Sequence, residues 1–377
     1  MKTFYAFTSA CLMLLFMGCG DDDDKQTVSV AAQNLPLLST DRNIGMIVGF
    51  NTDNPTNTRD SIADRWSEAV SAGMRVGRLQ IDWPELEPTP GNYDKNELQD
   101  RLEVLQDDGL QIFLLISAYD SEGPVVPDDL SGKTFDDPEL INRFNQLMDW
   151  VIPMLVAHDG YLISISNEAD NSFGELENLS SELLVFLNQA KAHIHAIDAR
   201  MAVTVTFAEG SLTANFPGTD ALLEACDVGV FNFYGSASLE ASPFYRALTA
   251  EEIRSDIQQM LDKVGDKNIV IQELGMHSGS DELVGSEEVQ RAFFEVFFEE
   301  MEKEKRLKAA YVFQLVDWSP ALSDIYTASF EGTEVPDGFV EAFIASLNTI
   351  GMIHFTDGRR KAVWDEFLFW VDRFSED

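Results

Sequence analysis

The sequence predicts a (β/α)8 barrel, and three observations lead to this prediction. From about residue 42 onward, short apolar runs of strand length alternate with longer amphipathic stretches. The apolar runs are nearly continuous rather than alternating, which indicates strands that are buried on both faces, as in a parallel sheet. We count eight such runs, and eight parallel strands that alternate with helices form a closed barrel.

The strands are expected at the eight apolar runs, which are rich in Val, Ile, Leu and Phe. In chain order these runs are residues 44–50, 75–83, 110–118, 161–167, 201–207, 227–234, 269–273 and 309–318.

The helices are expected where apolar residues recur every three or four positions, as Ile62, Trp66 and Ala69 do. They are residues 61–72, 96–107, 138–156, 177–199, 220–225, 250–264, 286–305, 339–347 and 361–374. A doubly wound open sheet is the alternative, but it normally needs a phosphate-binding glycine turn, and the sequence has neither GxGxxG nor a P-loop. No Pro/Ser-rich linker interrupts residues 42–377, so we expect one domain there.

Composition narrows the classes of partner. The 377 residues include 65 acidic and 26 basic ones, which gives a net charge of −39. Such a charge repels phosphate backbones, so nucleic acid is not expected as a partner. Of the three cysteines, only Cys226 lies beyond residue 19, which excludes an internal disulfide of the barrel and a Cys-rich zinc cluster.

The N-terminus has the pattern of a secretory signal. A basic start precedes an apolar run over residues 10–18, which is far shorter than the ~20 residues of a membrane-spanning helix. Residues 15–19 resemble the bacterial lipobox, which implies lipidation of Cys19; ordinary signal cleavage nearby is the alternative. We therefore expect a signal peptide over residues 1–18 and an acidic, flexible tether over residues 19–41.

The acidic run at residues 21–24 resembles the export tag of outward-facing lipoproteins in some Gram-negative bacteria. The string 21–25 also matches a protease site used in recombinant expression, but its place directly behind Cys19 favours the natural tag. The resemblance implies a lipid anchor in the outer membrane and a domain that faces the exterior.

Two expected strands end in a glutamate. The fourth run ends in Asn167-Glu168, and the seventh ends in Gln272-Glu273. The strands of a barrel point to one mouth, so both carboxylates are expected there. A buried Glu is costly without a partner or a role, and a salt-bridged rim Glu is the alternative for either residue alone. A pair of carboxyls about 5–5.5 Å apart is what a retaining glycoside hydrolase needs.

These two strand ends resemble those of clan A, the large superfamily of retaining (β/α)8 glycoside hydrolases that includes cellulases, mannanases, xylanases and galactanases. The resemblance covers about residues 42–375 and implies that Glu168 is the acid/base and Glu273 the nucleophile. It also implies that Asn167 holds the sugar 2-hydroxyl. The family more often has Asn-Glu-Pro, and Ala169 stands here in place of that proline.

The same resemblance implies further substrate-binding residues. Tyr234, at the end of the sixth run, is expected to hydrogen-bond the nucleophile, and Arg78 in the second run to brace it. Trp318, at the end of the eighth run, is expected to be the platform under the scissile sugar. Trp83 is either a subsite wall or a lid on the barrel, and His277 is expected to reach a subsite.

At the end of the third run, many members of this superfamily carry a His or another polar residue, and Tyr119 is expected to take that place.

No metal and no cofactor are expected. The sequence has no HExxH, and His193 and His195 are two apart on a helix, where they do not share a face. The chain is therefore predicted to be a monomeric hydrolase of O-glycosyl bonds in a β-linked polysaccharide or oligosaccharide, with mannan, glucan, galactan and xylan left open. The alternatives are a non-catalytic glycan-binding lipoprotein on the same barrel, which has no need of both glutamates, and an aldolase or metal hydrolase, for which a strand-end Lys or His cluster is missing.

Overall fold

The computed structural model describes residues 42–375 except 50–58, 122, 175, 177, 209, 211–215, 240–241, 281–282 and 331–334. The predicted signal peptide, the tether and Cys19 lie outside the described residues.

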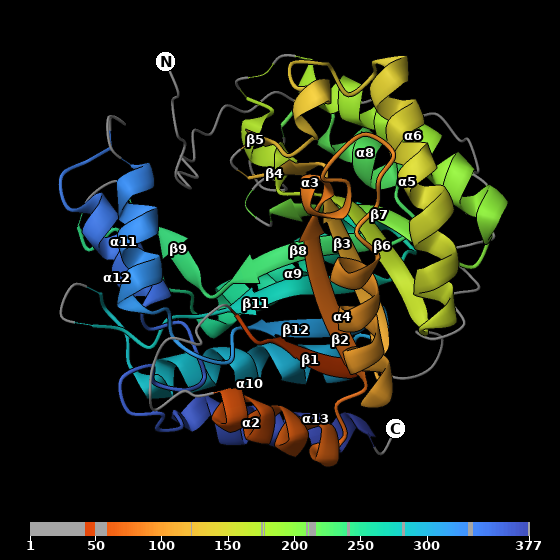
Figure 1. The fold of residues 1–377 in the computed structure, drawn as a ribbon. Coiled ribbons are helices and arrows are strands. Elements are labelled where there is room, and N and C mark those ends of the chain that lie inside the picture. The colour runs from red at the N-terminus through yellow and green to blue at the C-terminus, as the bar shows by residue number, and fades with distance from the viewer. Residues whose placement is uncertain are drawn as a thin grey trace.

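In this part of the chain, eight parallel strands form a nearly closed barrel that helices surround, which confirms the predicted fold class (Figure 1). The hydrogen-bonded order is β1-β12-β11-β8-β7-β6-β3-β2. The strands are β1 (Asn43–Ile47), β2 (Val76–Asp82), β3 (Gln111–Ser117), β6 (Gly160–Asn167), β7 (Ala202–Ala208), β8 (Gly229–Tyr234), β11 (Ile269–Gly275) and β12 (Leu307–Phe313).

The two ends of this order, β1 and β2, lie next to each other and bring the sheet round on itself. Gly45 of β1 makes this approach possible. A Cβ atom at Gly45 would come within 2.7 Å of both the carbonyl oxygen of Val76 and the ring of Tyr311, which leaves no room for a side chain.

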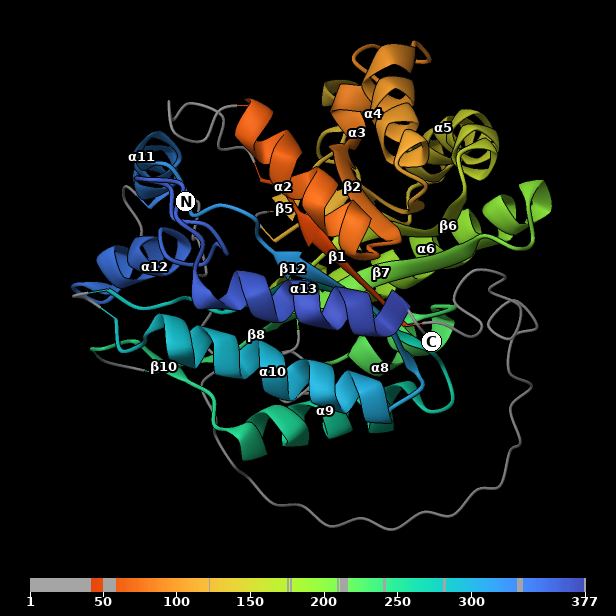
Figure 2. The ribbon, with the colours of Figure 1, turned by 90° about the horizontal axis from the view of Figure 1, so that it is seen from below.

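Helices cover the outside of the barrel, and Figure 2 shows α13, α10 and α9 in succession along one side. Each predicted helix is present, with ends shifted by a few residues at most. The helices are α2 (Arg59–Ala72), α3 (Trp83–Leu86), α4 (Lys95–Asp107), α5 (Pro138–Ala157), α6 (Leu179–Ile197), α8 (Thr219–Ala225), α9 (Ala250–Val264), α10 (Glu287–Lys303), α11 (Pro320–Ser329), α12 (Phe339–Leu347) and α13 (Ala362–Ser375).

Some short elements were not expected from the sequence. Helix α11 lies in a stretch where no helix was expected, although Ser319-Pro320 is a helix-start signal: the Ser319 hydroxyl accepts a hydrogen bond from the Leu322 N–H (3.2 Å). The others are α3, two hairpins and two 3-10 turns at the ends of strands. They are β4 (Tyr119–Asp120) with β5 (Gly123–Pro124), β9 (Ser236–Ser238) with β10 (Tyr245–Ala247), η1 (Asp128–Leu130) and η2 (Ala169–Ser172).

The last strand is shorter than predicted, because β12 ends at Phe313 rather than at residue 318. Beyond this point the chain pairs with a later segment. The carbonyls of Gln314 and Leu315 accept hydrogen bonds from the N–H groups of Met352 and Ile353 (3.0 and 2.9 Å). The apolar run therefore continues past the barrel strand, and periodicity cannot show where the partner changes.

The interior of the barrel changes from apolar to polar along the strands. Val76, Phe113, Val230 and Tyr311 belong to one buried apolar cluster near the strand starts. Two and four residues further along β2, the inward positions hold Arg78 and Gln80 instead. The carboxyl ends of the strands thus form a polar mouth above an apolar plug.

A buried ion pair fastens α6 to the start of β8. Asp227 lies 2.7 Å from Nζ of Lys191 and 3.0 Å from Nε2 of His195, and it also accepts a hydrogen bond from the N–H of Val203 (3.0 Å). Burial alone would raise the pKa of Asp227, but the hydrogen bond from His195 and the charge of Lys191 outweigh it and lower the pKa.

Asp227→Ala is expected to lower the free energy of unfolding by about 3 kcal/mol, because it removes the buried acceptor that Lys191, the His195 ring and the Val203 N–H share. Urea unfolding followed by circular dichroism at pH 7 measures this change. Asp220→Ala is the matched control. It removes an exposed ion pair with Lys263, also 2.7 Å long, and should cost at most about 1 kcal/mol. Equal losses in both variants would contradict the prediction.

Candidate active site

Glu168 lies directly after β6 and at the start of η2. Its backbone has a φ of 50°, a left-handed conformation that is strained for a residue with a Cβ, and such strain is typical of functional positions. The N–H of Glu168 donates to the carbonyl of Thr206 on β7 (2.9 Å), which holds this turn against the neighbouring strand. The side chain is 5% exposed at the mouth of the barrel.

Glu273 lies within β11, and an irregular register explains its direction. Consecutive residues of a regular strand point to opposite faces. Here the pairing of β11 with β8 shifts between Ile271 and Glu273, so Gln272 and Glu273 both reach groups inside the barrel. Bulges of this kind often re-aim side chains next to active sites.

Two groups hold the Glu273 carboxylate. Nη2 of Arg78 lies 3.1 Å from Oε1, and the Tyr234 hydroxyl donates to Oε2 at 2.6 Å. The structure thus brings together three of the residues that the sequence singled out. Burial raises the pKa of Tyr234 well above its usual value, so its hydroxyl keeps the proton that it donates.

The two glutamates share one low-dielectric site but have different partners. Burial, and then the charge of Glu273, raise the pKa of Glu168 well above its usual range. Burial also raises the pKa of Glu273, but the Arg78 cation and the Tyr234 hydroxyl favour its ionised form. Within the described part of the chain, the donors to Glu168 are two neutral amides: Nδ2 of Asn232 at 2.8 Å and Nδ2 of Asn171 at 3.3 Å. At neutral pH this arrangement favours a protonated Glu168 beside an ionised Glu273.

An amide network lies beneath Glu168. Oδ1 of Asn167 accepts from Nε2 of Gln272 (2.9 Å) and from Nδ2 of Asn232 (3.3 Å). Oε1 of Gln272 accepts from the Thr206 hydroxyl (2.7 Å), and Nε2 of Gln272 also donates to Oδ1 of Asn232 (3.3 Å). All four side chains are buried, so their orientations are fixed by one another.

The sequence interpretation missed three of the polar residues at this mouth: Asn232, Gln272 and Asp120. The only signal for Asn232 was its parity with Tyr234 in the sixth run. Tyr119 was expected at the site, but its ring is buried against Phe135, and Asp120, one residue later, points to the mouth instead. Oδ1 of Asp120 accepts from Nδ2 of Asn167 at 3.0 Å.

The assignment of Trp83 to the substrate site was wrong. Its side chain is 0% exposed, its ring packs edge-on against Phe144 of α5, and its N–H donates to Glu87 (2.9 Å). The strand ends one residue earlier, and Trp83 begins α3, which turns the indole outward under the helix layer. Neither the subsite wall nor the lid on the barrel describes this position, which packs between the barrel and α5.

Trp318 does not end a strand as expected, because it lies five residues beyond β12 and packs edge-on against Tyr326 of α11 (4.6 Å between ring centroids). The aromatic residue at the end of β12 is Phe313. Its ring meets that of Tyr234 edge-on at 6.1 Å, next to the hydroxyl that holds Glu273.

His277 is buried two residues beyond the end of β11, with 2% of its surface exposed, and neither ring nitrogen has a hydrogen-bond partner among the described residues. Its ring lies against Gly285, and burial together with the charge of Lys361 lowers its pKa to about 4. Contact with a substrate stays a prediction for this residue.

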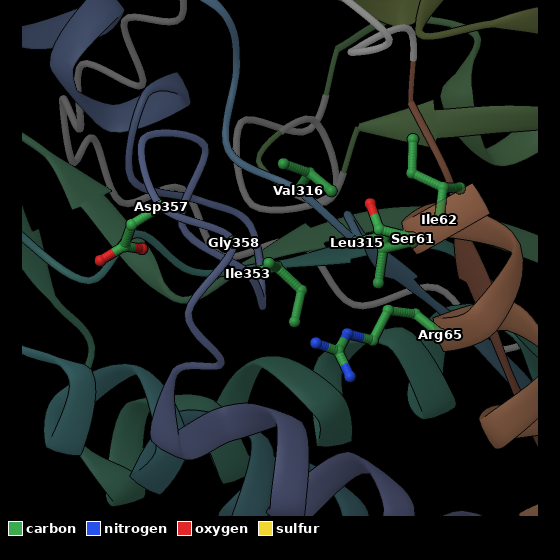
Figure 3. Close-up of a pocket in the computed structure, with 8 residues that line it drawn as sticks. All are labelled: Ser61, Ile62, Arg65, Leu315, Val316, Ile353, Asp357 and Gly358. Carbon is green, nitrogen blue, oxygen red and sulfur yellow. The ribbon is translucent and has the colours of Figure 1, made fainter. Parts of the chain in front are cut away.

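A separate cavity of about 230 Å³ lies beside the mouth, between the start of α2 and the turn that precedes α13 (Figure 3). The glutamates do not line it. Its lining residues are Ser61, Ile62, Arg65, Leu315, Val316, Ile353, Asp357 and Gly358.

Among the described residues, no cluster of His, Cys, Asp and Glu side chains is arranged to hold a metal ion. No helix in the described ranges combines the length and the apolar character needed to cross a membrane.

The sequence matches no family model and no curated protein. Among solved structures, the fold is similar to that of a variant of a GH5_18 protein from Bifidobacterium longum subsp. longum in complex with Manβ1-4GlcNAc. The TM-score is 0.62 at 14% identity, over 88% of this chain and 78% of that one. A GH5_18 variant from Streptomyces cattleya, in complex with the same disaccharide, gives 0.63 at 12% identity, over 88% and 80%.

A β-glycosidase structure also matches, with a TM-score of 0.62 at 11% identity, over 89% of this chain and 96% of that one. At these identities the likeness is one of fold. It confirms, for the fold, the resemblance to the (β/α)8 glycoside hydrolases of clan A.

The buried His277 should make stability depend on pH. Its pKa is lower in the folded protein (about 4) than in the unfolded chain (about 6.5), so its contribution is complete above pH 6.5 and is lost as the pH falls towards 4. The loss should reach about 3 kcal/mol. Urea midpoints of the wild type and of His277→Gln, measured between pH 7 and pH 4, test this. The variant should lose less stability over that range, and parallel curves would show that His277 is not responsible.

Proposed function

We propose that this protein is a retaining glycoside hydrolase that cleaves β-linked oligosaccharides or polysaccharides, with Glu168 as acid/base and Glu273 as nucleophile. The observation that carries the proposal is the pair of buried carboxylates at one barrel mouth with opposite environments. Glu273 has a cation and a hydroxyl that favour its charge, whereas the described partners of Glu168 are amides and its pKa is raised. A glycan-binding protein has no use for two such costly groups.

In the first step, protonated Glu168 gives its proton to the glycosidic oxygen while a carboxylate oxygen of Glu273 attacks the anomeric carbon. The bond to the leaving sugar breaks, and the leaving oxygen keeps the proton. Glu273 becomes a neutral ester, so its negative charge no longer raises the pKa of Glu168. The Arg78 cation and the Tyr234 hydroxyl orient the attacking carboxylate.

In the second step, ionised Glu168 takes a proton from water, and the oxygen of that water attacks the anomeric carbon. The ester bond breaks and Glu273 leaves as a carboxylate, which restores both starting protonation states. Two displacements at one carbon give net retention of configuration. Asn167, next to Glu168 and fixed by the amide network, is placed to hold the sugar 2-hydroxyl with its remaining amide hydrogen.

The sugar platform is assigned to Phe313 rather than to Trp318. Phe313 ends β12 beside Tyr234, and a flat ring at this place matches the C–H face of a pyranose. As the substrate class we propose β-linked neutral sugars, with β-mannosides tested first, because two proteins of similar fold bind Manβ1-4GlcNAc.

We further propose that the enzyme works as a monomer at the outer face of the outer membrane, held by lipid on Cys19. The support is the lipobox-like sequence and the acidic run behind it. Single acyl chains bind membranes only marginally, but a lipoprotein carries several.

Glu168→Ala should slow hydrolysis of substrates with poor leaving groups by about 100-fold or more, and of activated aryl glycosides much less in the first step. Sodium azide should rescue turnover of activated substrates and give the β-glycosyl azide, because the small anion enters the space of the missing carboxylate. Steady-state kinetics and proton NMR of the azide product measure both effects.

Glu273→Ala is the matched variant, because it removes the partner carboxylate from the opposite side of the sugar. Azide should then replace the nucleophile and give the α-glycosyl azide. If Glu168→Ala slows both substrate types equally and azide has no effect, Glu168 is not the acid/base.

Cys19→Ala should release the protein from the membrane, since the anchor is lost while the barrel is unchanged. Fractionation of cells into soluble and membrane parts, followed by immunoblotting, measures the distribution. A variant that stays fully in the membrane fraction would contradict the lipid anchor without touching the proposed chemistry.

A further inference from the structure

Two chains of hydrogen-bond donors converge on Asp120 at the mouth of the barrel. From one side, Nη2 of Arg78 donates to Oε1 of Gln80 (2.7 Å), and Nε2 of Gln80 donates to Oδ2 of Asp120 (3.2 Å). From the other side, Nδ2 of Asn167 donates to Oδ1 of Asp120 (3.0 Å). The Ser117 hydroxyl adds a donor to Oδ2 at 3.1 Å, and the N–H and hydroxyl of Ser121 add donors to Oδ1 at 2.7 and 3.2 Å.

The convergence fixes the direction of every amide in both chains. A guanidinium only donates and an ionised carboxylate only accepts. Gln80, which lies between Arg78 and Asp120, must therefore turn its oxygen to the first and its nitrogen to the second. Asn167 must likewise turn its nitrogen to Asp120, which points its oxygen into the amide network.

The fixed oxygen of Asn167 in turn orders the groups around Glu168. Gln272 and Asn232 both have to present nitrogen to Oδ1 of Asn167, at 2.9 and 3.3 Å. The same nitrogen of Asn232 donates to Oε1 of Glu168 at 2.8 Å. The ionised Asp120 thus orients Asn167, and Asn167 orients Asn232, so that Oε1 of Glu168 accepts a hydrogen bond.

We propose that Asp120 is a positioning residue of this site: through Asn167 and Asn232 it keeps Oε1 of Glu168 as an acceptor, so that the transferable proton of Glu168 resides on Oε2. The inference rests on the proposed function, in which Glu168 is the proton donor. Among the described residues, the contact that Oε2 makes is the longer one to Asn171 (3.3 Å), whose half-buried amide can turn to accept the proton on Oε2.

The reversed network shows why the direction matters. If Asn232 presented its oxygen to Oε1, a protonated Glu168 would place its proton between Oε1 and that oxygen. The proton would then lie in the buried amide layer and not where a glycosidic oxygen can reach it. Reversal is costly while Asp120 is ionised, because the oxygen of Asn167 would face the carboxylate.

Asp120→Asn should reverse the network rather than merely weaken it. Gln80 stays fixed by Arg78, so we expect the new side chain to turn its oxygen to Gln80 and its nitrogen to Asn167, at the cost of the hydrogen bond that the Ser121 N–H donates to Oδ1 in the wild type (2.7 Å). Asn167 then presents its oxygen to residue 120 and its nitrogen to Gln272 and Asn232. Each of these amides has to turn in response, and Asn232 shows its oxygen to Glu168.

The substitution also removes a charge, and this effect has to be separated from the reversal. The titratable groups that act on Glu168 are Glu273 of β11, Asp170 of η2, Asp120 of β4 and the Tyr234 hydroxyl of β8. The charge of Asp120 raises the pKa of Glu168, so its loss should lower that pKa in any case. Asp82→Asn is the charge control. Asp82 ends the neighbouring strand β2, so its substitution also removes a negative charge near the mouth. The Asn167 side chain bonds to Asp120, Asn232 and Gln272 rather than to Asp82, so this substitution leaves those hydrogen bonds in place.

The test is the infrared C=O stretch of protonated Glu168 in the full-length protein, assigned by its disappearance in Glu168→Gln. It is measured without substrate while the pH is titrated between 4 and 9. In the wild type the C=O group is Oε1 and accepts from Asn232. In Asp120→Asn the protonated oxygen becomes Oε1, so the band should move to another frequency, and the Glu168 pKa should fall.

Asp82→Asn should leave the frequency of that band in place. Burial, and then the charges of Asp120 and Glu85, raise the pKa of Asp82 to about 6. The charge effects of Asp82→Asn and Asp120→Asn are therefore compared above pH 7, where Asp82 of the wild type is ionised. Asn232→Ser is a second variant, which removes the donor to Oε1 and should shift the band even if Asp120→Asn fails to fold.

The kinetic readout is the difference between leaving groups. In Asp120→Asn, kcat should fall about 10-fold or more for poor leaving groups and much less for activated aryl glycosides. An unchanged band in Asp120→Asn and Asn232→Ser, or an equal band shift in Asp82→Asn, would overturn the inference. If the band shifts as expected but the protein hydrolyses no glycoside, the role of Asp120 in the hydrogen-bond network is supported and the proposed function is rejected.

Discussion

Two carboxylates that are buried beside each other cannot both ionise cheaply, and the rest of the site is arranged around this constraint. Arg78 and Tyr234 contact the Glu273 carboxylate and favour its ionised form. The partners of Glu168 are amides, which stabilise either protonation state only weakly. One proton shared between two unequal partners is what acid/base chemistry at neutral pH requires.

The barrel supplies this inequality through local irregularities rather than through its regular strands. A register shift in β11 lets Gln272 serve the amide network while the next residue, Glu273, meets Arg78. The left-handed backbone of Glu168 turns its side chain at the end of β6, where Asn232 of β8 reaches it. An apolar plug lies beneath the mouth, and such low-dielectric surroundings strengthen electrostatic contacts between buried groups.

The amino-acid sequence was sufficient to predict the eight barrel strands and the nine longer helical stretches, but not α3, α11 or the end of β12. The roles of Arg78 and Tyr234 came from the resemblance to clan A, and the residues could be transferred by position because both lie on regular stretches of β2 and β8. Gln272 was not predictable, since regular alternation would place it opposite Glu273. Trp318 was misplaced for a related reason: the apolar run continues past Phe313, but its hydrogen bonds pass to a segment near the C-terminus.

The central claim is that Glu273 becomes covalently bound to the sugar while Glu168 moves the proton. Trapping with 2-deoxy-2-fluoro-β-glycosyl fluorides tests it most directly, since the fluorine slows hydrolysis of the ester more than its formation. Peptide mass spectrometry of the inactivated protein should find one fluorosugar on the peptide that contains Glu273, and Glu273→Gln should remain unlabelled. A label on another carboxylate, or no label from a sugar series that the enzyme hydrolyses, would contradict the account.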